Sequence, residues 1–286
     1  MRCIEFLAED APVFLDAHNA CILLKARQKE LASVEVSLDL GLSTQSVDFS
    51  EWDCDAQELD KIVKKPNSAY IIRDGTANEI AIRNSIEYRL RPTEKGQAPA
   101  LVIDEELMHQ IAPLGPMEYA RRRAELAVNP GWRVLDIGTG LGYSAIASLD
   151  RDAHEVVSIE KHPEVIELSR MNPWSQRLHE DERVSIVIGD AFEVVSTLRV
   201  DSFDSVFHDP PQIQLTPKLY STKMYRLIGQ VLVPDGQLCH YVGPEGFSYR
   251  GQEVAKLVEN RLRGNGFHSI EFIPKLQSIL ATYGDK

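Results

Sequence analysis

Hydrophobic positions change their period along the first third of the chain. In residues 11–31, apolar side chains recur at steps of three and four, which predicts an amphipathic helix. Residues 34–40 instead alternate apolar and polar side chains, as a half-buried strand does. Further strands are expected at 45–49, 69–73 and 79–90, with the turn pair Asp74-Gly75 between the last two. Together these segments predict a small β-rich amino-terminal domain.

A polar segment with two prolines and a glycine, residues 92–99, follows this region. Such a composition is typical of a linker or a long loop. We therefore predict a domain boundary here, with a β-rich domain at 1–98 and a second domain at 99–286. Residues 100–103 are expected to form one more strand, and residues 116–129 a helix.

Beyond Trp132, apolar runs rich in β-branched residues alternate with helical patterns. The expected strands are 134–137, 156–159, 184–188, 205–208, 237–242 and 269–272. This alternation predicts an α/β fold, a doubly wound and mainly parallel sheet with helices on both faces. Ligands of such sheets bind outside the carboxyl ends of the strands.

Composition bounds the class of protein. The 286 residues are 43% hydrophobic and 26% charged, which is typical of a folded globular chain. No apolar run is long enough for a membrane span, and the acidic segment 1–10 does not resemble a signal peptide, so we expect a cytoplasmic protein without a membrane partner. The cysteines lack the spacing of a disulfide framework or a zinc site, so no metal is expected; they are Cys3, Cys21, Cys54 and Cys239.

The net charge argues against simple electrostatic binding of nucleic acid. The chain carries a formal charge of −12, whereas phosphate binding needs clustered Lys and Arg. The one compact basic run is Arg121-Arg122-Arg123. We interpret it as the solvated face of a helix, with a local basic patch as the alternative.

A glycine-rich loop follows the strand at 134–137. Asp136 precedes Gly138, Thr139, Gly140 and Gly142, in the pattern D-x-G-x-G-x-G. Glycine lets the backbone pass close to a ligand, but dinucleotide-binding loops have G-x-G-x-x-G instead. A carboxylate beside the loop suits an ammonium or a sulfonium better than a pyrophosphate. S-adenosyl-L-methionine carries both cations and no phosphate, so it is the cofactor we predict.

Acids also end the next two expected strands. Glu160 lies where nucleoside-binding α/β folds place a carboxylate that accepts ribose hydroxyl hydrogens, and Lys161 follows it. After the third strand, Asp190 is positioned to take the adenine amino group, with Ala191 among the apolar neighbours of the ring. A single acid after a strand is often a helix N-cap, which stays open as the alternative. Acids on three consecutive strand ends favour a nucleoside cofactor.

In this order, the motifs resemble those of the class I (Rossmann-like) S-adenosylmethionine-dependent methyltransferases, over about residues 132–241. The amino-acid sequences of these motifs further resemble those of a family of archaeal-type predicted methyltransferases related to spermidine synthases. The matching stretches are Asp-Ile-Gly-Thr-Gly-Leu-Gly-Tyr from Asp136, Leu-Ser-Arg-Met-Asn-Pro-Trp-Ser from Leu168, His-Asp-Pro-Pro from His208, and His-Tyr-Val-Gly from His240. The resemblance implies the cofactor and the fold, but no methyl acceptor.

The fourth strand ends in Asp209-Pro210-Pro211, which is similar to the D/N-P-P-Y/F/W loop of amino-methyltransferases. The resemblance implies that the acid side chain and a proline carbonyl accept both hydrogens of a planar amino group. Gln212 stands where that pattern has an aromatic ring, so the platform for a flipped base is missing. His208 is a candidate base or orienting group, or else a core histidine.

Two activities remain open at this point. The first is N-methylation of an RNA base or a protein side chain through the Asp-Pro-Pro loop. The alternative is aminopropyl transfer to a polyamine, as in spermidine synthases, although the Gly-Gly-Gly-Asp-Gly-Gly loop of those enzymes is absent. The acceptor therefore stays undetermined among RNA, protein and a small amine, and the β-rich domain could supply a homodimer contact.

Overall fold

The computed structural model describes residues 12–50, 52, 54–93 and 96–284. The expectations for segment 1–10 and Cys3 lie outside these residues, as do Glu94 and Lys95 of the predicted linker. The chain forms two compact units. The first is Met1–Ile111 with Met171–Trp174, and the second is Ala112–Arg170 with Ser175–Lys286. Each is described by itself. Among the described residues, no helix is long and apolar enough to cross a membrane.

The first unit contains three small antiparallel sheets and two helices. Its sheets are ordered β1-β4-β5, β2-β3 and β6-β7-β8-β9. The strands are β1 (Val13–Leu15), β2 (Ser33–Val36), β3 (Gln45–Asp48), β4 (Tyr70–Arg73), β5 (Thr76–Glu79), β6 (Ala81–Arg83), β7 (Glu87–Arg91), β8 (Ala100–Ile103) and β9 (Glu106–Leu107); the helices are α1 (Ala17–Gln28) and α2 (Ala56–Val63). We predicted the boundary at 98, whereas this unit runs to Ile111, because β8 pairs with β7.

Several predicted elements of this unit are confirmed and others are corrected. Asp74 and Gly75 both have positive φ and form the two-residue turn between β4 and β5, as their sequence indicates. The predicted helix at 11–31 is wrong at its start: β1 comes first, and the Asp16 side chain caps α1 by accepting from the Asn19 amide at 2.8 Å. Residues 79–90, predicted as one strand, are divided among the last residue of β5, the strand β6 and most of β7. Asn84 makes the turn between β6 and β7.

The second unit is built on one seven-stranded sheet, ordered β12-β11-β10-β13-β14-β18-β17. Its strands are β10 (Arg133–Ile137), β11 (Glu155–Glu160), β12 (Val184–Ile188), β13 (Phe203–His208), β14 (Leu232–Tyr241), β17 (Phe267–Ile273) and β18 (Ser278–Tyr283), with a small hairpin of β15 (Ser248–Tyr249) and β16 (Gln252–Glu253). All neighbours from β12 to β14 are parallel, and β18 runs antiparallel between β14 and β17. The predicted mainly parallel, doubly wound sheet is confirmed.

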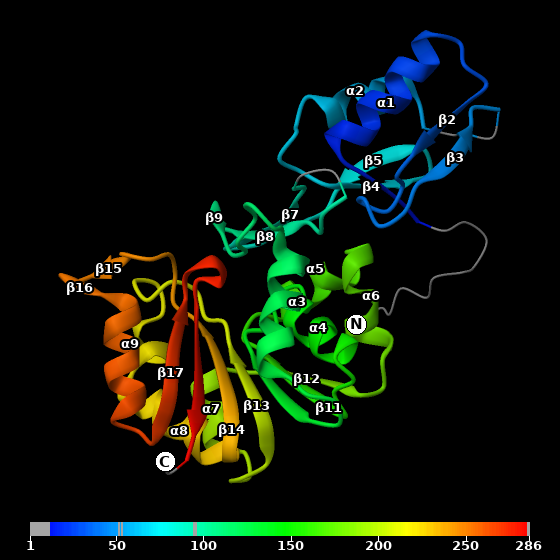
Figure 1. The fold of residues 1–286 in the computed structure, drawn as a ribbon. Helices are drawn as coiled ribbons and strands as arrows, with labels where there is room; N and C mark the ends of the chain where they lie inside the picture. The colour runs from blue at the N-terminus through cyan, green and yellow to red at the C-terminus, as the bar shows by residue number, and fades with distance from the viewer. Residues whose placement is uncertain (1–11, 51, 53, 94–95, 285–286) are drawn as a thin grey trace. The chain divides into compact units, whose positions relative to one another are not determined.

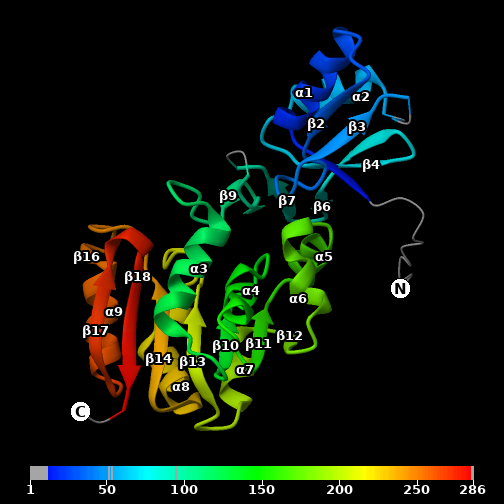
Figure 2. The ribbon, with the colours of Figure 1, turned by 45° about the vertical axis from the view of Figure 1, so that its right-hand side comes forward.

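Helices cover both faces of this sheet (Figures 1 and 2). They are α3 (Pro116–Ala127), α4 (Tyr143–Asp150), α5 (Pro163–Arg170), α6 (Gln176–Glu180), α7 (Ala191–Thr197), α8 (Thr222–Val231) and α9 (Val254–Arg263). The first four contact one another, and so do the last three, which places the two groups on opposite faces. The chain reverses its direction of travel across the sheet between β10 and β13, and this switch point is where a doubly wound sheet binds its ligand.

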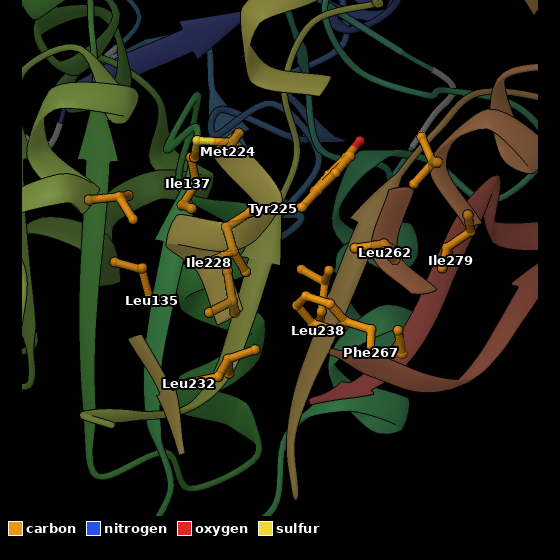
Figure 3. Packing of buried hydrophobic residues seen from close by; sticks show 14 of the residues in the cluster. Leu135, Ile137, Met224, Tyr225, Ile228, Leu232, Leu238, Leu262, Phe267 and Ile279 are labelled. Carbon is orange, nitrogen blue, oxygen red and sulfur yellow. The ribbon is translucent and has the colours of Figure 1, made fainter. Parts of the chain in front are cut away.

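The core on one face packs α8 and α9 against the sheet (Figure 3). Met224, Ile228 and Leu262 of the helices are fully buried against Leu135 and Leu238 of the strands. Burying each such side chain contributes roughly 1.5–3 kcal/mol. This packing holds β10 and β13 rigidly side by side, so the loops at their carboxyl ends have fixed positions.

Candidate functional site

The glycine loop between β10 and α4 lies against the loop that follows β13. Gly138 has φ +98 and Gly142 has φ +80, which side chains other than glycine rarely adopt. A Cβ on Gly138 would lie 2.8 Å from the carbonyl oxygen of Asp209, and one on Gly142 would lie 2.5 Å from the side chain of Leu178. The loop therefore has no room for side chains, and it brings the backbone of β10 directly to Asp209.

Asp136 is buried under this loop. Its Oδ2 accepts a hydrogen bond from Ser158 Oγ at 2.6 Å, and Ser158 Oγ is also 2.6 Å from Thr139 Oγ1. Asp136 Oδ1 is buried and has no hydrogen-bond partner among the described residues. Burial, together with the nearby charges of Asp209 and Glu160, raises the pKa of Asp136 to about 7, although the hydrogen bond from Ser158 acts in the opposite direction. A cation placed at this oxygen would satisfy it and favour the ionised carboxylate.

Glu160, the last residue of β11, lies over the same loop. Its Oε2 accepts from the Gly140 amide at 3.0 Å, and its Oε1 accepts from the amides of Lys161 and His162 at 2.8 and 3.0 Å. Three backbone donors thus fix a carboxylate that is only 8% exposed. Lys161 contributes its amide, while its side chain is exposed. The predicted contact of Glu160 with a ribose remains a prediction that this placement supports.

Asp190 follows the edge strand β12 and caps α7. Its carboxylate accepts from the Phe192 amide at 3.0 Å, so the N-cap alternative describes its observed bond. Ala191 is the first residue of α7. The ammonium groups of Lys218 and Lys223 lie 4.3 and 4.7 Å from the centre of the Phe192 ring. Contact of Asp190 and Ala191 with an adenine stays a prediction.

Asp209 is held by an arginine that the sequence analysis assigned to a solvated face. Arg123 Nη1 donates to Asp209 Oδ2 at 2.9 Å, and the arginine is only 6% exposed. The interpretation is correct for Arg121 and Arg122, which are exposed, and wrong for Arg123. The reason is helical spacing: Arg123 shares the buried face of α3 with Tyr119 and Ala127. Sequence reasoning missed it because a run of three charges conceals which one faces inward.

The Asp-Pro-Pro loop is braced from behind. The carbonyl oxygen of Pro211 accepts from Thr216 Oγ1 at 2.9 Å and from the Tyr220 hydroxyl at 3.2 Å. The side chain of Gln212 is exposed, whereas Tyr220 is only 1% exposed. Tyr225 is also fully buried. Neither of these two tyrosine rings can therefore replace the missing aromatic platform by stacking on a base. The loop is therefore rigid but offers no tyrosine platform.

His208 and His240 are core residues. His208 Nε2 donates to the Leu219 carbonyl at 2.9 Å, and its ring packs 4.5 Å from that of His240. His240 Nδ1 donates to the His208 carbonyl at 2.9 Å, so its neutral Nε2 accepts from the Tyr225 hydroxyl at 3.1 Å. Burial lowers the pKa of His208 to about 4 and that of His240 well below its usual value. Both rings are 0% exposed, which favours the core-histidine alternative for His208, and a catalytic role stays a prediction.

These histidines make the fold sensitive to mild acid. Burial lowers the pKa of His179 to about 4 as well, so between pH 6.5 and 4 the unfolded chain binds protons that the folded chain does not. We expect the free energy of unfolding, measured in urea, to fall as the pH drops through this window. The raised pKa of Asp136 has the opposite effect on the free energy of unfolding, which it increases as the pH drops from 7 to 3.8. This single group opposes three histidines, so the net free energy of unfolding should still fall.

A matched variant checks the assignment. His179→Gln preserves a group that can bond Ser169 Oγ, which lies 2.8 Å from His179 Nε2, and it should flatten the pH dependence. Stability that stays level or rises on acidification in the parent protein would contradict the account.

The second unit thus brings most of the predicted site together. The carboxylates of Asp136, Glu160 and Asp209 converge on the glycine loop from β10, β11 and β13, which are neighbours in the sheet. Asp190 follows the next strand, β12. The residues fit S-adenosylmethionine: a buried carboxylate oxygen without a partner suits a cation, and glycines with positive φ at 138, 140 and 142 suit close approach of a ligand to the backbone. Asp136 and Glu160 are the residues that would hold its charged and ribose ends.

Comparisons with known proteins agree with this geometry. Residues 108–198 match the family model of protein-L-isoaspartate(D-aspartate) O-methyltransferase, and residues 161–247 match a model described as S-adenosyl-L-methionine-dependent methyltransferase. The uncharacterized protein MJ1233 of Methanocaldococcus jannaschii is 38% identical over 82% of this chain and 80% of its own.

Enzymes of polyamine synthesis are also similar. Polyamine aminopropyltransferase 2 of Streptomyces coelicolor is 34% identical over 40% of this chain, which spans only 22% of that protein. The crystal structure of spermidine synthase from Thermotoga maritima has a TM-score of 0.54 at 17% identity, covering 73% of this chain and 76% of its own. That likeness concerns the fold. The chain belongs to the same family as the Methanocaldococcus jannaschii relative, and it is a class I S-adenosylmethionine-dependent methyltransferase.

Proposed function

We propose that this methyltransferase methylates a nitrogen atom, in a planar amino or amide group of an RNA base or a protein side chain. The observation that carries the proposal is the placement of Asp209, the first residue of the Asp-Pro-Pro loop, directly against Gly138, at the switch point of the sheet. An acid and a proline carbonyl beside the methyl donor can accept both hydrogens of such a group. The nitrogen lone pair is then free to point at the methyl carbon.

S-adenosylmethionine supplies the electrophilic methyl group on its sulfonium. Asp209 accepts one hydrogen of the acceptor nitrogen, and the Pro210 carbonyl accepts the other. Pro211 is braced by Thr216 and Tyr220, so the loop need not reorganise when the acceptor arrives. The nitrogen lone pair forms the new bond to carbon as the carbon–sulfur bond breaks, and the nitrogen afterwards loses one proton to water. Asp136 and Glu160 hold the cofactor.

The test is a methylation assay with methyl-labelled S-adenosylmethionine on separate RNA and protein fractions. We expect label in one fraction, in a form that survives mild alkali, because N-methyl groups are stable there whereas carboxyl methyl esters release methanol. Label that alkali releases would overturn N-methylation. It would instead favour the carboxyl chemistry named by the isoaspartate O-methyltransferase model that matches residues 108–198.

The similarity to a polyamine aminopropyltransferase favours a second candidate, aminopropyl transfer from decarboxylated S-adenosylmethionine. Three carboxylates around one loop would suit a polycation. Calorimetric titration with S-adenosylmethionine, S-adenosylhomocysteine and the decarboxylated cofactor distinguishes the two. Tighter binding of the first two supports methyl transfer, and a preference for the decarboxylated form, with product from a polyamine, supports the alternative.

A further inference from the structure

Arg123 joins three segments at the carboxyl edge of the sheet. It enters from α3 and pairs with Asp209 after β13 at 2.9 Å. Its Nη2 donates to the Leu276 carbonyl, before β18, at 3.4 Å. Its guanidinium also lies 5.5 Å from the centre of the Tyr241 ring, at the end of β14. The side chain of Arg123 is 8% exposed and that of Asp209 is 34% exposed, so the arginine is the fixed partner of the pair.

This contact divides the site into two electrostatic halves. Asp136 and Glu160 form no ion pair within the described part of the chain, so the half that holds the cofactor is negative and suits its cations. Asp209 instead faces a guanidinium that stays charged at any physiological pH. The half that faces the acceptor is therefore a neutral pair.

We propose that Arg123 is a positioning residue that sets the class of acceptor: by pairing with Asp209, it makes the site select a neutral amino or amide nitrogen over an alkylammonium. This inference rests on the proposed function. An alkylammonium brought to Asp209 also approaches the guanidinium, whose repulsion offsets the attraction of the carboxylate. A neutral amino group needs only a hydrogen-bond acceptor. Because Arg123 occupies Oδ2, Oδ1 is the oxygen left to accept from that amino group.

Cofactor analogues measure this charge balance without knowledge of the acceptor. Sinefungin carries an amine where S-adenosylmethionine carries its methyl sulfonium, and S-adenosylhomocysteine has a neutral thioether there. The ratio of their affinities therefore reports the field at the methyl position. In Arg123→Met, where the charge of Asp209 is uncompensated, we expect sinefungin to gain about tenfold over S-adenosylhomocysteine. Arg123→Lys keeps the charge and should leave the ratio near that of the parent protein.

Two further variants test whether the effect passes through Asp209. In the double variant Arg123→Met with Asp209→Asn, the ratio should return toward that of the parent. In Asp209→Asn alone, the guanidinium is uncompensated and sinefungin should lose about tenfold, which gives a readout even if Arg123→Met fails to fold. With S-adenosylhomocysteine bound, spermidine should bind Arg123→Met and not the parent.

An unchanged analogue ratio in both Arg123→Met and Asp209→Asn would overturn the inference, as would equal binding of spermidine to the parent and Arg123→Met. Failure of the proposed function looks different, since alkali-labile methyl label leaves these ratios untouched. The two claims therefore fail separately.

Discussion

Asp209→Ala is expected to lower the rate of methyl transfer about 1,000-fold, because the acceptor nitrogen loses the carboxylate that orients it. Affinity for S-adenosylhomocysteine should change little, since Asp209 lies on the acceptor side of Gly138. The measurement is an initial rate with labelled cofactor and the identified acceptor fraction, beside a calorimetric titration. Gln214→Ala is the matched control, because Gln214 is an exposed residue of the same loop.

Turnover that persists in Asp209→Ala, with the protein folded and the cofactor bound, would remove the Asp-Pro-Pro loop from the mechanism. A parallel loss of cofactor affinity would instead assign Asp209 to the cofactor half of the site. Because Gln214→Ala leaves the carboxylate and both prolines intact, its rate should equal that of the parent protein.

Gly138→Ala is the change we expect to damage the fold and the site together. The new methyl group would lie 2.8 Å from the Asp209 carbonyl, at a φ of +98. Positive φ and the clash should together lower the free energy of unfolding by about 2–4 kcal/mol. Displacement of the glycine loop, which lies between Asp136 and Glu160, should also abolish measurable binding of S-adenosylhomocysteine. Urea unfolding and calorimetry check both effects.

The variant Gly131→Ala separates the cost of a positive φ from the cost of a steric clash. Gly131 has φ +80, but an added Cβ there meets nothing within 4 Å. Its cost should be the conformational one alone, about 1 kcal/mol, with cofactor affinity retained. Equal destabilisation by the two alanines would show that the contact between Gly138 and Asp209 contributes nothing.

Much of the second unit could be predicted from sequence because its strands are buried on both faces. Such strands are continuous apolar runs, and β10, which is buried from Val134 to Ile137, matches the predicted strand 134–137 with Arg133 added at its start. By contrast, β18 was not predicted. Ser278–Tyr283 contains Ile279, Thr282 and Tyr283, all of which favour strands, so the signal was present and the prediction omitted it.

The first unit shows a local signal that the prediction omitted. The strand and helix assignments leave out α2, although Asp55 stands three residues before Glu58, a spacing typical of a helix start. In the structure, the Asp55 carboxylate accepts from the amides of Gln57 and Glu58 at 2.8 and 2.9 Å. α2 spans only eight residues, so its apolar pattern of Leu59 and Ile62 is short and the capping residues add the signal that identifies the helix start.

Some residues of the candidate site could be predicted from sequence and others could not. Asp136, Glu160 and Asp209 could be found from sequence, because each lies at the carboxyl end of a recognisable strand. Arg123 could not, because its partner lies 86 residues away and only the packing of α3 on the sheet joins them. His208 was ambiguous for the opposite reason. Its neighbours are catalytic in type, but burial decides its role.

The insertion of β18 between β14 and β17 constrains the order of folding. β17 forms hydrogen bonds only with β18 among the described strands, although β17 precedes β18 along the chain. β17 therefore joins the sheet only through β18, either after β18 has paired with β14 or together with it as a preformed hairpin. Until then β14 presents an open edge, on which other extended chains can pair. The refolding protein passes through a stage in which self-association competes with closure of the sheet, so its refolding yield should depend on concentration.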